Sequence, residues 1–235
     1  MTVDRRLEEL SARYRLPSAA VRALRRLIAL IADDPSAPTA LRDPAVAVDA
    51  HVADALVALE LAQVRAARRV ADLGAGAGFP GLVLAAALPD AAVTLVEASA
   101  RKCAFLERAV DAMALANVEV VAERAESWQA GLETRDLVTA RALAPLPVLV
   151  EYAAPLLLTG GALVAWKGRR DAAEEADGAA AAAATGLEPV DVRPVRPWAG
   201  AEHLHLHLYL KVGVTPSRFP RRPGIASKRP LRPFR

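Results

Sequence analysis

A run of glycines marks the place where this chain could hold a ligand: Val70-Ala71-Asp72-Leu73-Gly74-Ala75-Gly76-Ala77-Gly78-Phe79-Pro80-Gly81. A short apolar strand leads into the glycines, and a helix with Pro80 near its first position follows them. Glycine has no Cβ atom, so the backbone of this turn can lie directly against a nucleotide. Ligands of open parallel sheets bind at the carboxyl ends of such strands. The turn is therefore the first candidate binding site.

Two cofactors fit this turn. Residues 76–81 satisfy the dinucleotide pattern G-x-G-x-x-G, and Glu97 lies about 20 residues further on, where that pattern places a ribose-binding acid. The longer string from Asp72 to Gly78 reads D-x-G-x-G-x-G, which resembles motif I of Rossmann-like methyltransferases. A carboxylate at Asp72 suits the ammonium and sulfonium groups of S-adenosyl-L-methionine better than a pyrophosphate. The sequence therefore favours S-adenosyl-L-methionine, and an NAD-dependent oxidoreductase is the alternative.

Acidic residues follow the next two predicted strands as well. Glu97 comes directly after the apolar segment 92–96, where a carboxylate would accept hydrogen bonds from both ribose hydroxyls. Glu126 follows the strand 118–121, so it is expected at the same sheet edge, where a backbone N–H of Ala125 or Glu126 would contact adenine. An exposed carboxylate at a helix start explains Glu126 equally well.

The surrounding elements alternate between strand and helix. Apolar residues at three- and four-residue spacing predict helices over 1–32 and 44–65. The predicted strands are 70–73, 92–96, 118–121, 137–140, 162–166 and 204–212. The predicted helices between them are 80–88, 99–115, 146–158 and 171–184. This alternation predicts an α/β fold with a mostly parallel, doubly wound sheet.

Length and composition limit the classes of protein. The 235 residues suit one α/β domain with a modest extension. A single cysteine, Cys103, excludes an internal disulfide and a thiolate zinc site, and we interpret it as a small buried apolar residue. His203, His205 and His207 lie on one strand face but lack a suitably spaced carboxylate, so no metal site is predicted. The absence of a signal peptide or membrane span predicts a cytoplasmic protein.

Positive charge is concentrated at the C-terminal end. From Pro216 onward there are seven of the 30 basic residues and no acidic residue, which leaves 23 basic against 27 acidic residues elsewhere. An extended basic arm of this kind most often contacts phosphates. A solvated, disordered tail is the alternative interpretation. The expected organisation is a helical extension over 1–65, a sheet domain over 66–213 and a basic tail over 214–235.

Further motifs resemble one family along nearly the whole chain. Together with the glycine run, they are similar to the glucose-inhibited-division protein B family of small-subunit rRNA guanine-N7 methyltransferases. The matching segments are Leu41–Pro44, His51–Asp54, Glu97–Lys102, Thr139–Ala142, Trp166–Gly168 and the tail from Thr215 to Leu231. Two positions depart from the pattern: Glu97 stands where the family usually has Asp, and Ala55 where Ser is common. The stretch Arg193–Gly200 and the His-Leu alternation after it are individual to this sequence. None of these departures removes a group that the chemistry needs.

The resemblance implies a Rossmann-like class I methyltransferase fold with a mostly parallel seven-stranded sheet and an N-terminal helical extension. It implies S-adenosyl-L-methionine as cofactor, 16S rRNA or the small ribosomal subunit as partner, and N7 of guanine-527 as target; a monomer is expected. The cofactor-binding residues expected from motif and resemblance are Asp72, Gly74, Gly76, Gly78, Phe79, Glu97, Ala125, Glu126 and Arg141. The expected RNA-binding residues are Lys167, Arg218, Arg221, Arg222, Lys228 and Arg229.

The chemistry of this target agrees with the residues present. Guanine N7 carries an in-plane lone pair and can attack the sulfonium methyl group directly, so the protein needs to position the reactants and exclude water. No general base is required, and no acid–base pair is evident in the sequence. Arg141 is the predicted catalytic residue, holding guanine O6, a nearby phosphate or the methionine carboxylate. A non-catalytic RNA-binding protein for ribosome assembly is the second alternative.

Overall fold

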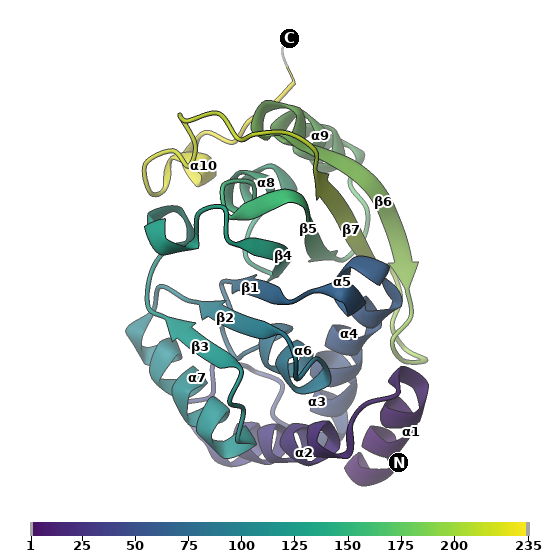
Figure 1. The fold of residues 1–235 in the computed structure, drawn as a ribbon. Helices are drawn as coiled ribbons and strands as arrows, with labels where there is room; N and C mark the ends of the chain where they lie inside the picture. Colours follow the sequence, from purple (N-terminus) through teal and green to yellow (C-terminus); the bar gives the residue numbers. More distant parts are fainter. Residues whose placement is uncertain (1, 234–235) are drawn as a thin grey trace.

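The computed structural model describes residues 2–233, and its centre is one seven-stranded sheet in the order β3-β2-β1-β4-β5-β7-β6 (Figure 1). The strands are β1 Arg69–Leu73, β2 Ala92–Val96, β3 Val118–Val121, β4 Arg135–Arg141, β5 Leu157–Lys167, β6 Leu187–Val195 and β7 Leu204–Lys211. Strands β1 to β5 pair in parallel, and β7 runs antiparallel to both of its neighbours. The predicted mostly parallel, seven-stranded α/β sheet is confirmed.

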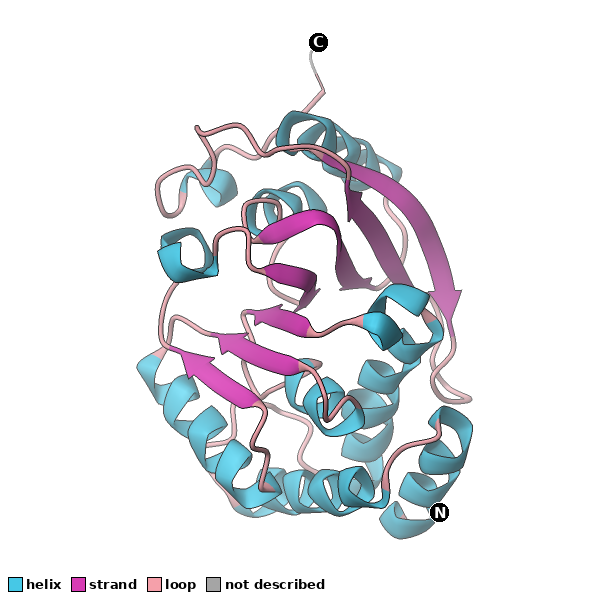
Figure 2. Cartoon of the chain, viewed as in Figure 1, coloured by secondary structure: helices cyan, strands magenta, loops and turns pink. Residues whose placement is uncertain are grey.

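Helices cover both faces of this sheet (Figure 2). One face packs α1 Val3–Tyr14, α2 Ser18–Asp33, α3 Pro44–Ala47, α4 Asp54–Leu56, α5 Ala62–Ala66, α6 Gly81–Ala87 and α7 Ala100–Met113. The other face packs α8 Leu146–Ala153, α9 Ala172–Thr185 and α10 Ile225–Lys228. Alternate residues of a strand point to opposite faces, so Val70 joins the first hydrophobic cluster and Ala71 the second. Both faces of the central strands are therefore buried, as expected for a doubly wound sheet.

The N-terminal helices share the core of the sheet. Leu7, Leu24 and Leu56 belong to the same hydrophobic cluster as Val70 and Phe105. The predicted helix over 1–32 is divided into α1 and α2, because Arg15 adopts a left-handed conformation with φ 56° and ends α1. The helical extension thus forms a layer over one sheet face.

The predicted helix over 44–65 is a chain of short helical pieces. A six-residue π-helical turn, η1 Val48–Ala53, lies between α3 and α4, and a 3₁₀ turn, η2 Val57–Glu60, precedes α5. π-helical turns are rare and often occur at functional sites. This turn contains His51 and directly precedes Asp54, two residues that recur below.

Two predictions of secondary structure were wrong. The segment predicted as helix over 146–158 ends at Ala153 and gives way to β5 at Leu157, because Pro155 has no N–H for another helical turn. Strand β6 was not located, since Pro189 and Pro194 argue against a strand. It lies at the sheet edge, where proline is tolerated because one side of the strand makes no ladder bonds.

The C-terminal segment folds back over α8 and ends near α9, at the top of Figure 1. It buries Phe219 and Ala226 and forms the short helix α10. Of the predicted basic tail, Arg235 lies outside the described residues. Within residues 2–233, none of the helices has the length and apolar character needed to cross a membrane.

Candidate functional site

The glycine loop after β1 is fastened from beneath by Asp72. This side chain is fully buried; its Oδ2 accepts from the Gly81 N–H at 2.9 Å, and its Oδ1 accepts from the Thr139 hydroxyl at 2.9 Å. Burial raises the pKa of Asp72 to about 7, against the lowering effect of those two hydrogen bonds. A Cβ atom at residue 81 would meet Asp72 Oδ2 at 2.8 Å, so glycine permits this approach. Asp72 therefore lies below the loop and lines neither of the cavities described next.

Glu97, at the end of β2, supports the loop from the side. Its Oε2 accepts from the Gly76 N–H at 3.1 Å, and its Oε1 accepts from the Ser99 N–H at 2.9 Å. The Lys102 ammonium lies 3.8 Å from Oε2. A carboxylate has about four accepting positions, so Glu97 retains capacity for a ligand hydroxyl.

Two cavities open at the carboxyl edge of the sheet. The Glu97 cavity has a volume of about 350 Å³, within the range of about 300–1,000 Å³ typical of ligand pockets. Its lining includes Gly74, Glu97, Lys102, Ala125, Glu126, Ala142, Leu143, Tyr152 and Ser227. The Arg141 cavity is lined by Pro38, Thr39, His51, Gly74, Ala75, Gly76, Ala77, Phe79, Lys102, Arg141 and Ala142. The two cavities share Gly74, Lys102 and Ala142, so they adjoin each other.

Arg141, the last residue of β4, is held in a fixed position. Its Nη1 donates to Asp54 Oδ2 at 2.6 Å and to the carbonyl of Ala50 at 3.1 Å, and its guanidinium lies 5.3 Å from the centre of the Phe79 ring. Burial raises the pKa of the Asp54 carboxyl, and Arg141 opposes that rise. The Ala50 carbonyl belongs to the π-helical turn η1, so the irregular helix and the catalytic candidate are directly linked.

His51 completes this cluster. Its ring stacks on Phe79 with centroids 4.4 Å apart. Arg141 Nη2 lies 3.2 Å from His51 Nδ1, and Thr39 Oγ1 lies 3.1 Å from Nε2. A guanidinium only donates, so Nδ1 must accept, which assigns the ring proton to Nε2. Burial, followed by the charge of Arg141, lowers the pKa of His51 to about 4, so the imidazole is neutral at pH 7.

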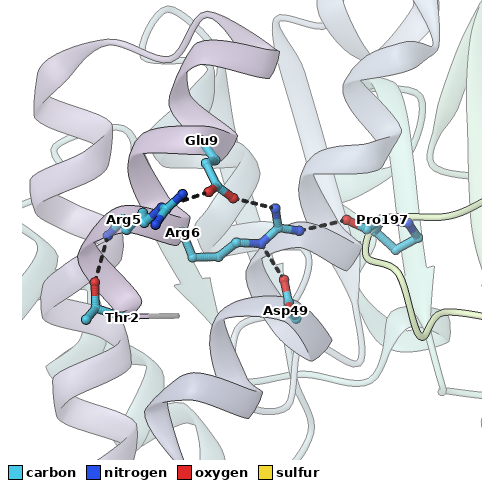
Figure 3. Close-up of polar contacts among 6 residues, drawn as sticks. All are labelled: Thr2, Arg5, Arg6, Glu9, Asp49 and Pro197. Atoms are coloured by element: carbon cyan, nitrogen blue, oxygen red, sulfur yellow. Dashed lines mark hydrogen bonds and ion pairs between the residues drawn. The ribbon is translucent and has the colours of Figure 1, made fainter.

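Other contacts fix the helical layer that carries His51. The Trp166 indole donates to the Asp54 carbonyl at 2.9 Å, which joins the end of β5 to the start of α4. Figure 3 shows Arg6 of α1 between Glu9, Asp49 and the carbonyl of Pro197. Its Nε donates to Asp49 Oδ1 at 2.6 Å, so α1 is tied to the π-helical turn.

Glu126 lies between the Glu97 cavity and the C-terminal segment. It is buried, and its Oε1 accepts from the Gly224 N–H at 2.9 Å. Beside it, the Tyr152 hydroxyl lies 3.2 Å from Ser227 Oγ. The C-terminal segment therefore contacts the cavity wall directly.

The structure divides the predicted site residues into groups. Gly74, Gly76, Phe79, Glu97, Ala125, Glu126 and Arg141 line one or both cavities. Asp72 and Gly78 line neither; a Cβ at Gly78, where φ is +92°, would overlap Leu82. Cys103 is buried in α7, as predicted, with its Sγ donating to the Glu97 carbonyl at 3.1 Å.

The predicted RNA-binding residues also separate. Arg218, Arg222, Lys228 and Arg229 are exposed. Arg221 instead forms a two-pronged ion pair with the buried Glu151, and Lys167 pairs with Glu174 at 2.6 Å. Because its guanidinium is engaged inside the protein, we leave Arg221 out of the RNA-binding set proposed below.

Several residues of the site were missed by sequence reasoning. Lys102 borders both cavities, and Tyr152 and Ser227 border the first. His51, known from the sequence only as part of the matching segment His51–Asp54, lies in the Arg141 cavity with Asp54 behind it. Their spacing of three residues on a helix was the available signal, because it places both side chains on one face. Among residues 2–233, no cluster of three or more His, Cys, Asp or Glu side chains could hold a metal ion.

Comparison with known proteins gives consistent matches. The family model described as rRNA small subunit methyltransferase G matches residues 37–200. The ribosomal RNA small subunit methyltransferase G of Roseiflexus castenholzii is 38% identical over 234 residues, which cover 98% of this chain and 94% of that one. The protein of the same name from Chloroflexus aggregans is 42% identical over 196 residues, covering 82% of each chain.

Solved structures show the same fold. The Burkholderia thailandensis 1,6-didemethyltoxoflavin-N1-methyltransferase, determined with S-adenosylhomocysteine, superposes with a TM-score of 0.51 at 18% identity. The match covers 68% of this chain and 77% of that chain. At this identity the likeness concerns the fold, and it confirms the expected Rossmann-like, class I methyltransferase architecture.

Proposed function

The chain belongs to the rRNA small subunit methyltransferase G family, and on that premise we propose that it methylates N7 of a guanine in 16S rRNA, at position 527. It is an S-adenosyl-L-methionine-dependent rRNA methyltransferase. One observation supports methyl transfer to a base: two adjoining cavities meet at Gly74, Lys102 and Ala142, so a cofactor in one and a base in the other would come together there.

The residues of the Glu97 cavity fit S-adenosyl-L-methionine. Glu97 has free accepting capacity for the ribose hydroxyls, and Ala125 and Glu126 lie where the adenine would be bound. Gly76 lines the adjoining Arg141 cavity; it has φ +59°, and a Cβ atom there would meet only the Gly74 carbonyl oxygen, at 3.6 Å. The loop backbone therefore presents an open surface to the methionine part, beside the Lys102 ammonium.

The Arg141 cavity fits an unprotonated nucleophile. When bound, the cofactor supplies an electrophilic methyl group, and guanine N7 attacks it with its own lone pair. No carboxylate lines this cavity in the described part of the chain. His51 is neutral and its Nδ1 accepts from Arg141, so it is not available as a base. The protein then acts by orienting the base and excluding water.

Arg141 is the proposed catalytic residue because it orients the guanine. Asp54 and Ala50 engage Nη1, and Phe79 lies under the guanidinium. His51 Nδ1 takes one donor of Nη2. The second Nη2 donor and the Nε–H would bind guanine O6 or the adjacent phosphate, and either contact leaves N7 free to react. Arg141 also borders the methyl-transfer point through the neighbouring Ala142, which lines both cavities.

The RNA partner would approach the same edge of the sheet. Arg218, Arg222, Lys228 and Arg229 are exposed on the segment that passes the Glu97 cavity, and they would contact backbone phosphates. Lys167, at the end of β5, would contribute once its pairing with Glu174 is exchanged for a phosphate. We further propose that the protein acts as a monomer on the small ribosomal subunit or its rRNA, in the cytoplasm.

A labelling experiment tests this function. Purified protein is incubated with radiolabelled S-adenosyl-L-methionine and small ribosomal subunits that lack the modification, and the label is mapped by nuclease digestion and mass spectrometry. We expect 7-methylguanosine at a single 16S position. Label at another atom or nucleotide would contradict the proposed target. Tight NADH binding without methyl transfer would return the glycine loop to the dinucleotide interpretation.

A further inference from the structure

The C-terminal segment, residues 216–231, is anchored to the body of the protein beside the cofactor cavity. Arg221 Nε donates to Glu151 Oε1 at 2.6 Å, and its Nη2 contacts Glu151 Oε2. The Glu151 side chain is 1% exposed, whereas that of Arg221 is 23% exposed. Glu151 belongs to α8, so this ion pair joins the segment to a helix of the sheet domain.

The anchor lies next to residues that line the Glu97 cavity. Glu151 precedes Tyr152 in α8, and the Tyr152 hydroxyl contacts Ser227. Both Tyr152 and Ser227 line the cavity. Three residues beyond Arg221, the Gly224 N–H donates a hydrogen bond to Glu126, which also lines the cavity. The segment thus contributes Ser227 to the wall of the cavity and contacts two other lining residues, Tyr152 through a hydroxyl and Glu126 through a backbone N–H.

The contacts of the wall differ in strength. The single hydrogen bond between Tyr152 and Ser227 adds little net stability, whereas a two-pronged arginine–carboxylate contact fixes geometry as well as charge. The Glu151 partner raises the pKa of Arg221, which is consistent with a firm pair. Arg232 makes a weaker contact, 3.7 Å from Asp177, with its side chain 68% exposed. The Arg221–Glu151 pair is therefore the main polar anchor of the wall, beside the apolar burial of Phe219 and Ala226.

The outer side of the same segment carries free positive charge. Arg218, Arg222, Lys228 and Arg229 are exposed, and Lys228 directly follows Ser227 of the cavity wall. An RNA backbone held by these side chains would restrain the segment in the position that closes the cavity. Restraint by one ligand lowers the ordering cost for the other, which couples the two binding events.

We propose that Arg221 and Glu151 are positioning residues for the cofactor: their ion pair holds the C-terminal segment as a wall of the Glu97 cavity, so that RNA bound to this segment and cofactor bound in the cavity strengthen each other. This rests on the proposed function, because it takes S-adenosyl-L-methionine as the occupant of the cavity. The coupling is reciprocal: each ligand raises the affinity of the other by the same factor.

The test compares three variants of the full chain: Arg221→Ala, Arg221→Lys and the matched control Arg232→Ala. Calorimetry gives the Kd of S-adenosylhomocysteine, with and without small ribosomal subunits, and steady-state assays give KM for S-adenosyl-L-methionine and kcat. We expect Arg221→Ala to raise Kd and KM by about 5- to 10-fold and to abolish the tightening by subunits. We expect kcat at saturating cofactor to stay within about twofold, since the reacting groups are untouched. We expect the Kd and KM of Arg221→Lys to lie between those of the wild type and Arg221→Ala. Arg232→Ala should behave as the wild type.

Two results would overturn the proposal. One is an unchanged Kd for S-adenosylhomocysteine in a folded Arg221→Ala protein. The other is a fall in kcat with KM unchanged, because that would place Arg221 in the chemistry. If Arg221→Ala does not fold, Arg221→Lys carries the test, with the same direction and a smaller change. Failure of the wild-type protein to bind S-adenosylhomocysteine would overturn the proposed function itself, so the two failures are distinguishable.

Discussion

Two segments from opposite ends of the chain enclose the candidate site, and they differ in how they use charge. The upstream wall, residues 38–54, faces the Arg141 cavity. Its residues present little free charge to the cavity. Asp54 forms an ion pair with Arg141, and the His51 ring is neutral at pH 7. The downstream wall, residues 216–231, borders the Glu97 cavity and pairs only Arg221 deeply, with Glu151. Its other basic side chains remain exposed.

Composition alone counts all basic residues together, but in the structure they perform two tasks: some fix the geometry of the site, and others are free to bind phosphates. Arg141 and Arg221 are each fixed by a buried carboxylate, Asp54 and Glu151, and so give the site its shape. The exposed arginines and lysine of the downstream wall are free to exchange water for phosphate. We therefore expect changes in the upstream wall and its partner to affect catalysis, and changes in the downstream wall to affect binding.

The sharpest test of this contrast is Arg141→Ala. Loss of one preorganised donor at a reacting centre costs about 100- to 1,000-fold in kcat, and we expect a loss in that range. Asp54 would be left buried without its partner, which destabilises the protein by about 1–3 kcal/mol. Initial rates at saturating cofactor and subunits, with circular dichroism melting curves, measure both effects.

Lys167→Ala is the control for that variant, since Lys167 ends β5, the strand paired with β4, and also pairs with a carboxylate. It should lower the rate only by about two- to threefold, as expected for one phosphate contact. Wild-type turnover by Arg141→Ala would remove Arg141 from the mechanism and, with it, the distinction between the two walls.

The second test removes the free charge of the downstream wall: Arg218, Arg222, Lys228 and Arg229 are replaced together by alanine. RNA affinity should fall by about 10- to 100-fold at physiological salt, and the salt slope should drop by about one for each lost phosphate contact. Filter binding across a range of salt concentrations measures both. An unchanged salt slope would show that this segment does not meet the RNA backbone.

The carboxyl edge of the sheet could be predicted from the sequence. The glycine loop, Glu97, Ala125 and Arg141 follow four different strands, and the carboxyl ends of parallel strands meet at one edge. The structure places all four around the two adjoining cavities. Two predicted residues of this edge lie outside the cavities. Asp72, inside β1, bonds to Thr139 of the neighbouring strand, and Gly78 packs against Leu82.

The two walls could not be predicted to the same extent. A run of arginines reports charge but not pairing, so Arg221 was grouped with its exposed neighbours until the position of Glu151 was known. Likewise, helical periodicity reveals neither a π-helical turn nor the strand end that packs against it. The contact between His51 and Arg141 was therefore not predicted. Strand β6 was missed because its prolines argue locally against a strand. Only the tertiary structure shows that it lies at the sheet edge, where proline is tolerated.

The smallest expected effect concerns stability and the upstream wall. His51 is neutral in the folded protein, with a pKa of about 4, and about 6.5 when unfolded, so between these pH values the unfolded chain binds more protons. The stability that depends on neutral His51 is present above pH 6.5 and is lost as pH falls toward 4. At pH 5 the loss is about 2 kcal/mol. In His51→Asn, the free energy of unfolding should therefore depend less steeply on pH.

Urea unfolding at several pH values between 4.5 and 7.5 measures this slope. Asparagine can still accept a hydrogen bond from Arg141, so the variant removes the titrating ring while keeping that contact, although the stacking on Phe79 is lost. His203→Asn, at an exposed side chain, controls for the loss of an imidazole. A wild-type slope that survives in His51→Asn would mean that the ring is solvated and able to take a proton. His51 would then be an available base in the Arg141 cavity. The upstream wall would offer the ligand a group that can carry charge, and this difference from the downstream wall would be lost.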